Sequence, residues 1–179
     1  MTAAYTRVAM LLHWLMAMLI LGTFPLGSYM SDLKLSPQKL KLYAWHKWIG
    51  ITILALWLVR VLWRVSHRPP PLPPGTPRWQ ERAAEITHSL LYALMLAIPL
   101  SGWLMSSALG FTVVWFGVVP LPNLVAPDKG LGEVLKQVHS ALNDGLLVLV
   151  SLHLAAVVQH QFLLRDGVLW RMLPWGTKK

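Results

Sequence analysis

The sequence predicts an all-α integral membrane protein built as a four-helix bundle, and its composition and hydropathy both support this fold class. Of the 179 residues, 55% are hydrophobic and only 13% are charged, whereas soluble domains carry about 25% charged residues. The mean hydropathy is +0.52. Four separate stretches are apolar over roughly the 20 residues that a helix needs to cross a bilayer.

These apolar stretches predict membrane-spanning helices over residues 8–30, 42–64, 86–109 and 131–164. In the second, the stretch from Leu42 to Trp63 is interrupted only by Lys47 and Arg60, which lie near its ends, where long basic side chains can reach the membrane surface. In the fourth, Asp144 is the only charged residue between 138 and 164. The first stretch is too long for a signal-peptide apolar region and no small-residue cleavage site follows it, so we expect it to stay in the mature protein.

Two connections have distinctive compositions. A Pro-rich loop over 66–80 is expected to be an extended, stiff connector between the second and third helices. The segment 111–127 is apolar but short and broken by Pro120 and Pro122, which predicts an interfacial helix or loop that covers one end of the bundle. We expect one domain over residues 1–179.

The distribution of basic residues predicts that both termini lie in the cytoplasm. Four crossings put both termini on one side, and short loops rich in Lys and Arg stay inside. The side that holds the termini and the second loop carries Arg7, Arg60, Arg64, Arg68, Arg78, Arg82, Arg165, Arg171, Lys178 and Lys179. The other side carries Lys34, Lys39, Lys41, Lys47, Lys129 and Lys136, partly offset by Asp32, Asp128 and Glu133.

Composition also excludes several classes of function. The formal net charge is +9, but the charges flank apolar runs and do not form one face, so no nucleic-acid partner is expected. The absence of cysteine excludes cysteine-ligated iron–sulfur clusters, covalently attached c-type haem, disulfides and thiolate nucleophiles. Any cofactor must therefore be held by His, Met, carboxylates or the backbone.

The histidines fall at two depths of the predicted bundle. His46 and His139 lie at the outer level, whereas His13, His153 and His88 lie at the inner level. On the fourth helix His139 and His153 are 14 residues apart, which is about 21 Å and four turns, so both face nearly the same way. Imidazoles from facing helices are the usual axial ligands of haem iron in a bundle core. The pattern predicts two b haems, with His46 matching His139 and His13 matching His153.

Other interpretations of single residues stay open. His67 in the basic loop and His160 near the inner end of the last helix are better explained as polar surface residues. His88 could ligate the inner haem in place of His13, donate to a haem propionate, or contact a quinone headgroup. Gly50, one turn below His46, either lets a macrocycle approach or allows close helix packing. The methionines are expected to be apolar filling and not ligands.

In chain order, these features are an N-terminal basic residue, the His13-Trp14 pair, the Trp45-His46-Lys47 segment, the Pro-rich loop, His88, and His139 with His153. Together they resemble the prokaryotic cytochrome b561 family across essentially the whole chain. The resemblance implies a di-haem b cytochrome with four helices, located as a multi-pass protein in the bacterial inner membrane. It implies His46 and His139 as ligands of the outer haem, and His13 and His153 as ligands of the inner one. The family is related to the cytochrome b subunits of formate dehydrogenases and nickel–iron hydrogenases.

The expected function is transmembrane electron transfer between a periplasmic redox partner and the quinone pool. One member of the family is described as a superoxide oxidase that reduces ubiquinone, and this chain resembles it in length and layout. Such an enzyme would use outer lysines to steer the anion, here Lys34, Lys39, Lys41 and Lys47; ordinary solvated lysines are the alternative. No catalytic residue is assigned, and a monomer surrounded by membrane lipid is compatible with the sequence.

Two rival functions remain. The chain could be the cytochrome b anchor of a larger dehydrogenase or hydrogenase. It could also be a proton or metal-ion transporter that uses a histidine relay, although such relays commonly pair histidine with carboxylates and none lies at mid-membrane in the sequence.

Overall fold

The computed structural model describes residues 4–73, 75–173 and 175. Pro74 of the Pro-rich loop, and Lys178 and Lys179 of the predicted inner side, lie outside the described residues. The chain forms four long helices, followed by a short π-helix and a 3-10 turn. Their bounds are α1 Arg7–Asp32, α2 Pro37–Ser66, α3 Arg78–Ala108, α4 Lys129–Val158, η1 Gln159–Leu164 and η2 Leu169–Met172.

Side-chain caps fix where three of these helices begin. Thr6 accepts a hydrogen bond from the amide of Ala9, Ser36 from the amide of Lys39, and Asp128 from the amide of Leu131. Each cap satisfies one of the amides that a helix N-terminus leaves unpaired. α3 instead begins directly after Pro77, without a side-chain cap.

The helices extend beyond their apolar cores. α3 begins at Arg78 and α2 at Pro37, several residues before the predicted spans that start at 86 and 42. The connector between α2 and α3 is therefore shorter than the predicted loop over 66–80. The added turns are charged or polar, and a hydropathy pattern identifies only the part of a helix that lies in the hydrocarbon.

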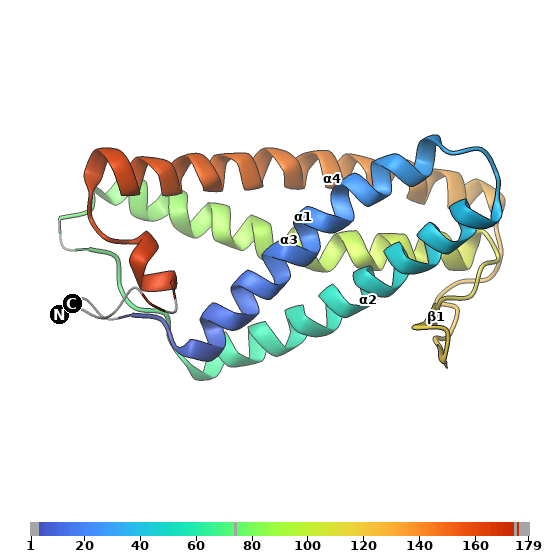
Figure 1. Cartoon of the computed structure of the whole chain (residues 1–179), viewed down its shortest axis with the longest axis horizontal. Helices are drawn as coiled ribbons and strands as arrows, with labels where there is room; N and C mark the ends of the chain where they lie inside the picture. The colour runs from blue at the N-terminus through green and yellow to red at the C-terminus, as the bar shows by residue number, and fades with distance from the viewer. Residues whose placement is uncertain (1–3, 74, 174, 176–179) are drawn as a thin grey trace.

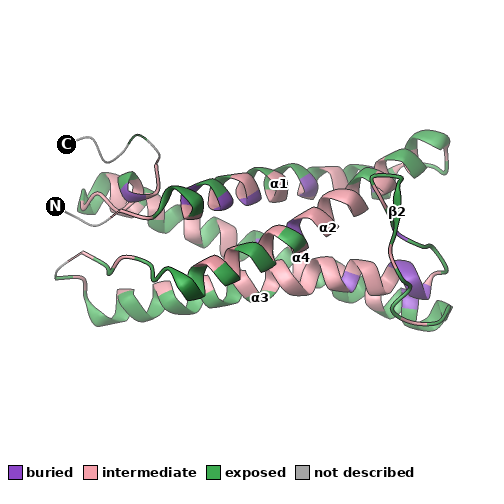
Figure 2. Cartoon of the chain, turned by 90° about the horizontal axis from the view of Figure 1, so that it is seen from below, coloured by how far each residue is buried: buried purple, intermediate pink, exposed green. Residues whose placement is uncertain are grey.

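The four helices form two antiparallel pairs, α1 with α2 and α3 with α4, and α2 also packs against α3 (Figure 1). All four are long and apolar enough to cross a membrane. The predicted all-α, four-span fold class is thus confirmed. The buried residues are few and scattered along the helices (Figure 2).

One end of the bundle gathers the N-terminal segment, the Pro-rich connector and the C-terminal segment. The indole Nε1 of Trp14 donates to the carbonyl of Met172 at 2.8 Å, and Tyr5 N donates to the carbonyl of Arg171. The guanidinium of Arg171 in turn donates to the carbonyl of Pro71 at 2.8 Å. We call this the inner end, after the orientation that the basic residues predict, and the opposite end the outer end.

At the outer end, the segment between α3 and α4 forms a loop with a small antiparallel hairpin and no helix. Its strands are β1 Val114–Trp115 and β2 Val119–Pro120. The indole of Trp48 on α2 donates to the carbonyl of Val114, and the indole of Trp115 donates to the hydroxyl of Thr52. These bonds hold the hairpin against α2 and cover the outer end.

Candidate haem-ligating site

At the outer level, His46 of α2 and His139 of α4 face one another across the bundle. Their ring centroids are 6.3 Å apart and the rings are inclined by 75°. Both imidazoles are half-buried. An iron between two imidazoles, at metal–nitrogen distances of about 2.0 Å, separates the ring centroids by about 6 Å. The observed spacing therefore fits a pair of axial ligands.

A cavity of about 510 Å³, including its open part, lies beside this pair. All four helices contribute to its lining, which is almost entirely apolar apart from the two imidazoles, Thr23 and Asn143. A low-polarity space with two convergent nitrogen ligands is the environment that a b haem requires.

Two glycines lie directly behind the outer imidazoles. A Cβ atom at Gly27 would lie 3.1 Å from Cε1 of His46, and one at Gly102 would lie 3.1 Å from Cε1 of His139. A side chain at either position would require the ring to shift by a few tenths of an ångström. Gly50 is different, because nothing lies within 4 Å of its Cβ position and it lines the cavity. This favours the interpretation of Gly50 as room for a bulky group over close helix packing.

The outer imidazoles differ in what their Nδ1 atoms contact. Nδ1 of His139 lies 3.0 Å from the carbonyl oxygen of Ile98 and 3.0 Å from the hydroxyl of Ser101. Because a carbonyl only accepts, Nδ1 carries the proton, which leaves the lone pair of Nε2 for a metal. Nδ1 of His46 is buried without a hydrogen-bond partner among the described residues.

The inner level repeats the outer spacing. The ring centroids of His13 on α1 and His153 on α4 are also 6.3 Å apart, inclined by 67°. His88 on α3 lies closer to His153, at 5.6 Å between centroids. The guanidinium of Arg60 approaches Nδ1 of His13 at 3.2 Å, while its Nε donates to the hydroxyl of Tyr92. A carbonyl thus accepts from Nδ1 of His139, whereas the Arg60 guanidinium can only donate to Nδ1 of His13. His13 would therefore bind a metal through Nε2 only on losing its Nε2 proton, or after Arg60 turns away from the ring.

The remaining histidines lie apart from both pairs. His67 stacks on the ring of Trp63 at 3.9 Å between centroids, and Nδ1 of His160 is hydrogen-bonded to the carboxylate of Asp166. Among the residues that the structure describes, no cluster of three or more His, Asp or Glu side chains is arranged to hold a bare metal ion. Paired imidazoles suit axial ligation of a haem better than a metal-ion relay.

The outer lysines have different surroundings. Nζ of Lys47 donates to the hydroxyl of Ser106 at 2.7 Å, and Nζ of Lys39 donates to carbonyls at the end of α1. Lys41 lies over the ring of Trp45, and Lys34 is exposed. Two of the four lysines proposed for steering therefore also stabilise the fold.

Comparison with known proteins assigns the family. The family model for prokaryotic cytochrome b561 matches residues 4–175. The chain belongs to the prokaryotic cytochrome b561 family. It is 34% identical to cytochrome b561 homolog 2 of Escherichia coli over 171 residues, which cover 94% of this chain and 90% of that protein. It is 27% identical to the probable superoxide oxidase CybB of Yersinia pestis, over 95% of this chain and 96% of that protein. Cytochrome b562 of Cereibacter sphaeroides is 28% identical, over 94% of each chain.

Membership of the cytochrome b561 family confirms several expectations from the sequence. The protein is a multi-pass protein of the bacterial inner membrane, binds b-type haem and functions in electron transport. The observed imidazole pairs, the apolar cavity and the glycines behind the rings fit such a cofactor. The transporter hypothesis is not supported by this family.

The packing of Gly27 and Gly102 against the outer imidazoles was not predicted from the sequence. Two features of the sequence could have pointed to them. Each glycine lies at the outer level of a spanning helix, and each follows a proline, Gly27 by two residues and Gly102 by three. Proline in a helix removes one backbone hydrogen bond, and membrane helices tolerate this. Which ring each glycine faces depends on the rotation of the helices, which the sequence does not specify.

Gly102→Val is expected to weaken haem retention at the outer pair roughly 10- to 100-fold, the range seen when groups that orient metal ligands are changed. The new side chain would displace the His139 ring by contact at Cε1. Gly145→Val on α4 is the matched control, because nothing lies within 4 Å of its Cβ position. Haem loss during dialysis, followed by absorbance, measures the effect; equal loss from both variants would argue against the packing role.

Proposed function

We propose that this cytochrome carries electrons from a periplasmic reductant to ubiquinone through two b haems. In this proposal His46 and His139 hold the outer haem, and His13 and His153 hold the inner one. The observation that carries it is the repetition of one imidazole spacing, 6.3 Å, at both levels of the bundle. Bound haem would supply a reversible one-electron couple.

The protein's contribution is to orient ligands, exclude water and limit the chemistry. Two imidazoles per iron would leave no open coordination position, and the sites would then favour outer-sphere electron transfer over oxygen binding. The hairpin covers the outer end and is fixed to α2 by Trp48 and Trp115.

Superoxide is the donor that we favour at the outer end. The relative from Yersinia pestis is named a probable superoxide oxidase, and the outer end of this chain carries lysines that would attract an anion. Two superoxide anions would each lose one electron to become dioxygen, and one ubiquinone would take up both electrons and two protons to become ubiquinol. His88, beside His153 at the inner level, is the residue proposed to contact the quinone.

The steering hypothesis is tested with exposed lysines that make no hydrogen bond in the described part of the chain. Lys34→Gln combined with Lys41→Gln is expected to slow reduction by superoxide several-fold at low ionic strength, and to weaken its salt dependence. The matched control changes Lys129 and Lys136, which are also exposed outer lysines, but lie beside Asp128 and Glu133, respectively. Stopped-flow absorbance of the haem bands measures the rates.

Equal slowing in both double variants would contradict local steering, because it would show that the rate depends only on the net charge of the protein. If superoxide fails to reduce the wild-type protein, the donor assignment is wrong, while the assignment of the histidine pairs is unaffected.

The two haems are expected to have different midpoint potentials. Nδ1 of His139 faces a carbonyl and Nδ1 of His13 faces the Arg60 guanidinium, and such groups tune a metal through its ligands. A potentiometric titration followed at the reduced absorbance band should require two one-electron steps. A titration described by a single potential would contradict the unequal surroundings.

A further inference from the structure

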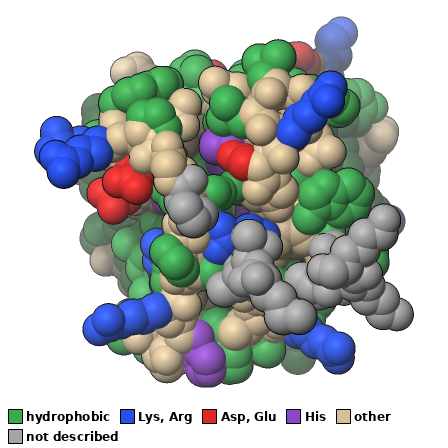
Figure 3. Space-filling model, turned by 90° about the vertical axis from the view of Figure 1, so that its left-hand side faces the viewer, with side chains coloured by type: hydrophobic (Ala, Val, Ile, Leu, Met, Phe, Trp, Pro, Cys, Tyr) green, Lys and Arg blue, Asp and Glu red, His purple; other side chains and the backbone are tan. Residues whose placement is uncertain are grey.

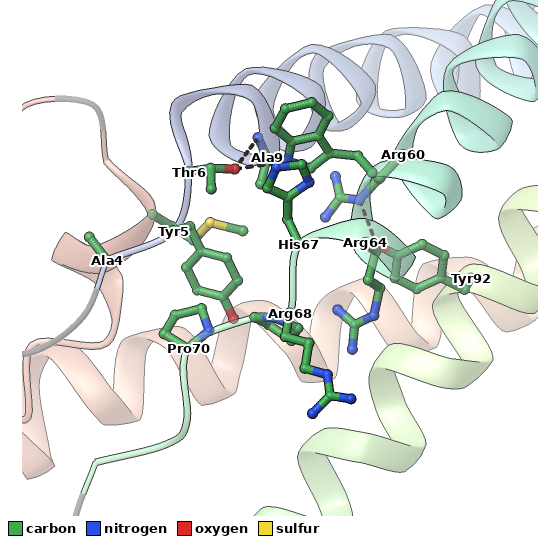
Figure 4. A pocket seen from close by; sticks show the side chains of 13 residues that line it. Ala4, Tyr5, Thr6, Ala9, Arg60, Arg64, His67, Arg68, Pro70 and Tyr92 are labelled. Carbon is green, nitrogen blue, oxygen red and sulfur yellow. Dashed lines mark hydrogen bonds between the residues drawn. The ribbon is translucent and has the colours of Figure 1, made fainter.

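Three arginines converge on a pocket at the inner end that neither histidine pair lines. The pocket has a volume of about 680 Å³, including its open part. It lies between the N-terminal segment, the end of α2, the Pro-rich connector, α3 and the C-terminal segment (Figure 4). Its polar lining includes Arg60, Arg64, Arg68, Tyr5 and Tyr92. Figure 3 looks onto this end and shows Lys and Arg side chains around its rim and toward its centre.

Among the described residues, no acidic side chain compensates the positive charges of the pocket. No Asp or Glu is among its lining residues, and the ion pairs of the described residues, Lys136 with Glu133 and His160 with Asp166, lie elsewhere. The guanidiniums of Arg60 and Arg64 lie 5.6 Å and 5.4 Å from the centroid of the same Tyr92 ring. Both cations therefore lie around one aromatic ring, and an anion that approached both would be stabilised.

The walls of this pocket are held in place by contacts within the protein. The Trp63 ring stacks on His67, and its indole donates to the hydroxyl of Thr6 at 2.9 Å. The guanidinium of Arg60 is already hydrogen-bonded to the hydroxyl of Tyr92 and to Nδ1 of His13. In contrast, Arg64 and Arg68 donate no hydrogen bond to any described residue, so their donors are available to a ligand.

The available arginines lie at the end of α2, where a membrane-spanning helix would reach the lipid headgroups. Arg64 is in the last turn of α2, and Arg68 follows the helix. Arginine binds phosphate through paired hydrogen bonds, and basic pockets between membrane helices on the cytoplasmic side suit anionic headgroups. Pro69, Pro70 and Met172 add apolar surface beside the arginines. We propose that this pocket binds the phosphate of an anionic phospholipid of the inner leaflet, with Arg64 and Arg68 as its ligands.

The test uses the haem-loaded, delipidated full-length protein in detergent. Phosphatidylglycerol, phosphatidylcholine with the same acyl chains, and inorganic phosphate are titrated separately, and the Tm is measured from the haem absorbance. Ligands that bind only the folded state raise the Tm with concentration. Phosphatidylglycerol should raise the Tm of the wild type at a concentration at least about tenfold lower than phosphatidylcholine does, because choline adds a positive charge opposite the arginines.

The variants locate the effect. Arg64→Gln with Arg68→Gln should abolish the response to phosphatidylglycerol. Arg78→Gln with Arg82→Gln should retain it, because these arginines have the same spacing at the same end but do not line the pocket.

Four results would overturn the proposal. They are an equal response to the two lipids, an equal response to inorganic phosphate, loss of the response in both double variants, and haem loss from R64Q/R68Q with the lipid response intact. The last result would mean that Arg64 and Arg68 bind the haem carboxylates and not a lipid phosphate. If R64Q/R68Q fails to fold, native mass spectrometry of the wild type decides, because preferential retention of phosphatidylglycerol supports the site and equal retention refutes it.

Discussion

Replacing His139 with alanine is expected to lower the haem content from about two per chain to about one. The loss should fall on the outer haem, because His139 is the partner of His46 at 6.3 Å and lines the same cavity. The inner pair, 14 residues further along the chain at His153, is about 21 Å away along the helix and should keep its low-spin spectrum.

A pyridine haemochrome assay gives the haem content of the His139→Ala variant, and low-temperature EPR resolves the two low-spin signals. His160→Ala is the matched control, because this histidine is in η1, which continues α4, but pairs with Asp166. Retention of both signals in His139→Ala would remove His139 from the set of ligands.

The second large effect separates His13 from His88 at the inner level. His13→Ala is expected to abolish the inner haem signal, whereas His88→Ala should retain it. The reason is the spacing to their shared neighbour His153: 6.3 Å for His13 equals the outer spacing, while 5.6 Å for His88 is shorter. An iron held at about 2.0 Å by each ring fits the longer distance better.

The same spectra decide between the alternatives for His88. Loss of the inner signal in His88→Ala, with retention in His13→Ala, would exchange their roles. If His88 contacts the quinone, His88→Ala should keep both haems and slow reoxidation by ubiquinone analogues. Unchanged reoxidation would leave His88 without a role in this proposal.

The sequence predicted the levels of the histidines because depth in a membrane helix follows from residue count. His46 and His139 were expected at one level and His13 with His153 at another, and the structure brings both pairs together. The placement of His88 beside His153 is consistent with the inner level expected for it. Periodicity and the constant rise of a helix carry this information without any knowledge of side-chain contacts.

What the sequence did not provide depends on helix rotation and on contacts between distant segments. Gly27 and Gly102 support the outer imidazoles only because their helices present them to α2 and α4. The pocket near Arg64 requires the N-terminal and C-terminal segments to meet. The hairpin between α3 and α4 follows from side-chain bonds to Trp48 and Thr52, and apolar composition alone did not distinguish it from an interfacial helix.

The most direct test of the account is the haem content of the purified wild-type protein, measured by pyridine haemochrome assay together with a reduced-minus-oxidised visible spectrum. The account predicts about two b haems per chain, both low-spin. One haem per chain would contradict the assignment of two ligand pairs. A high-spin spectrum would contradict bis-histidine ligation.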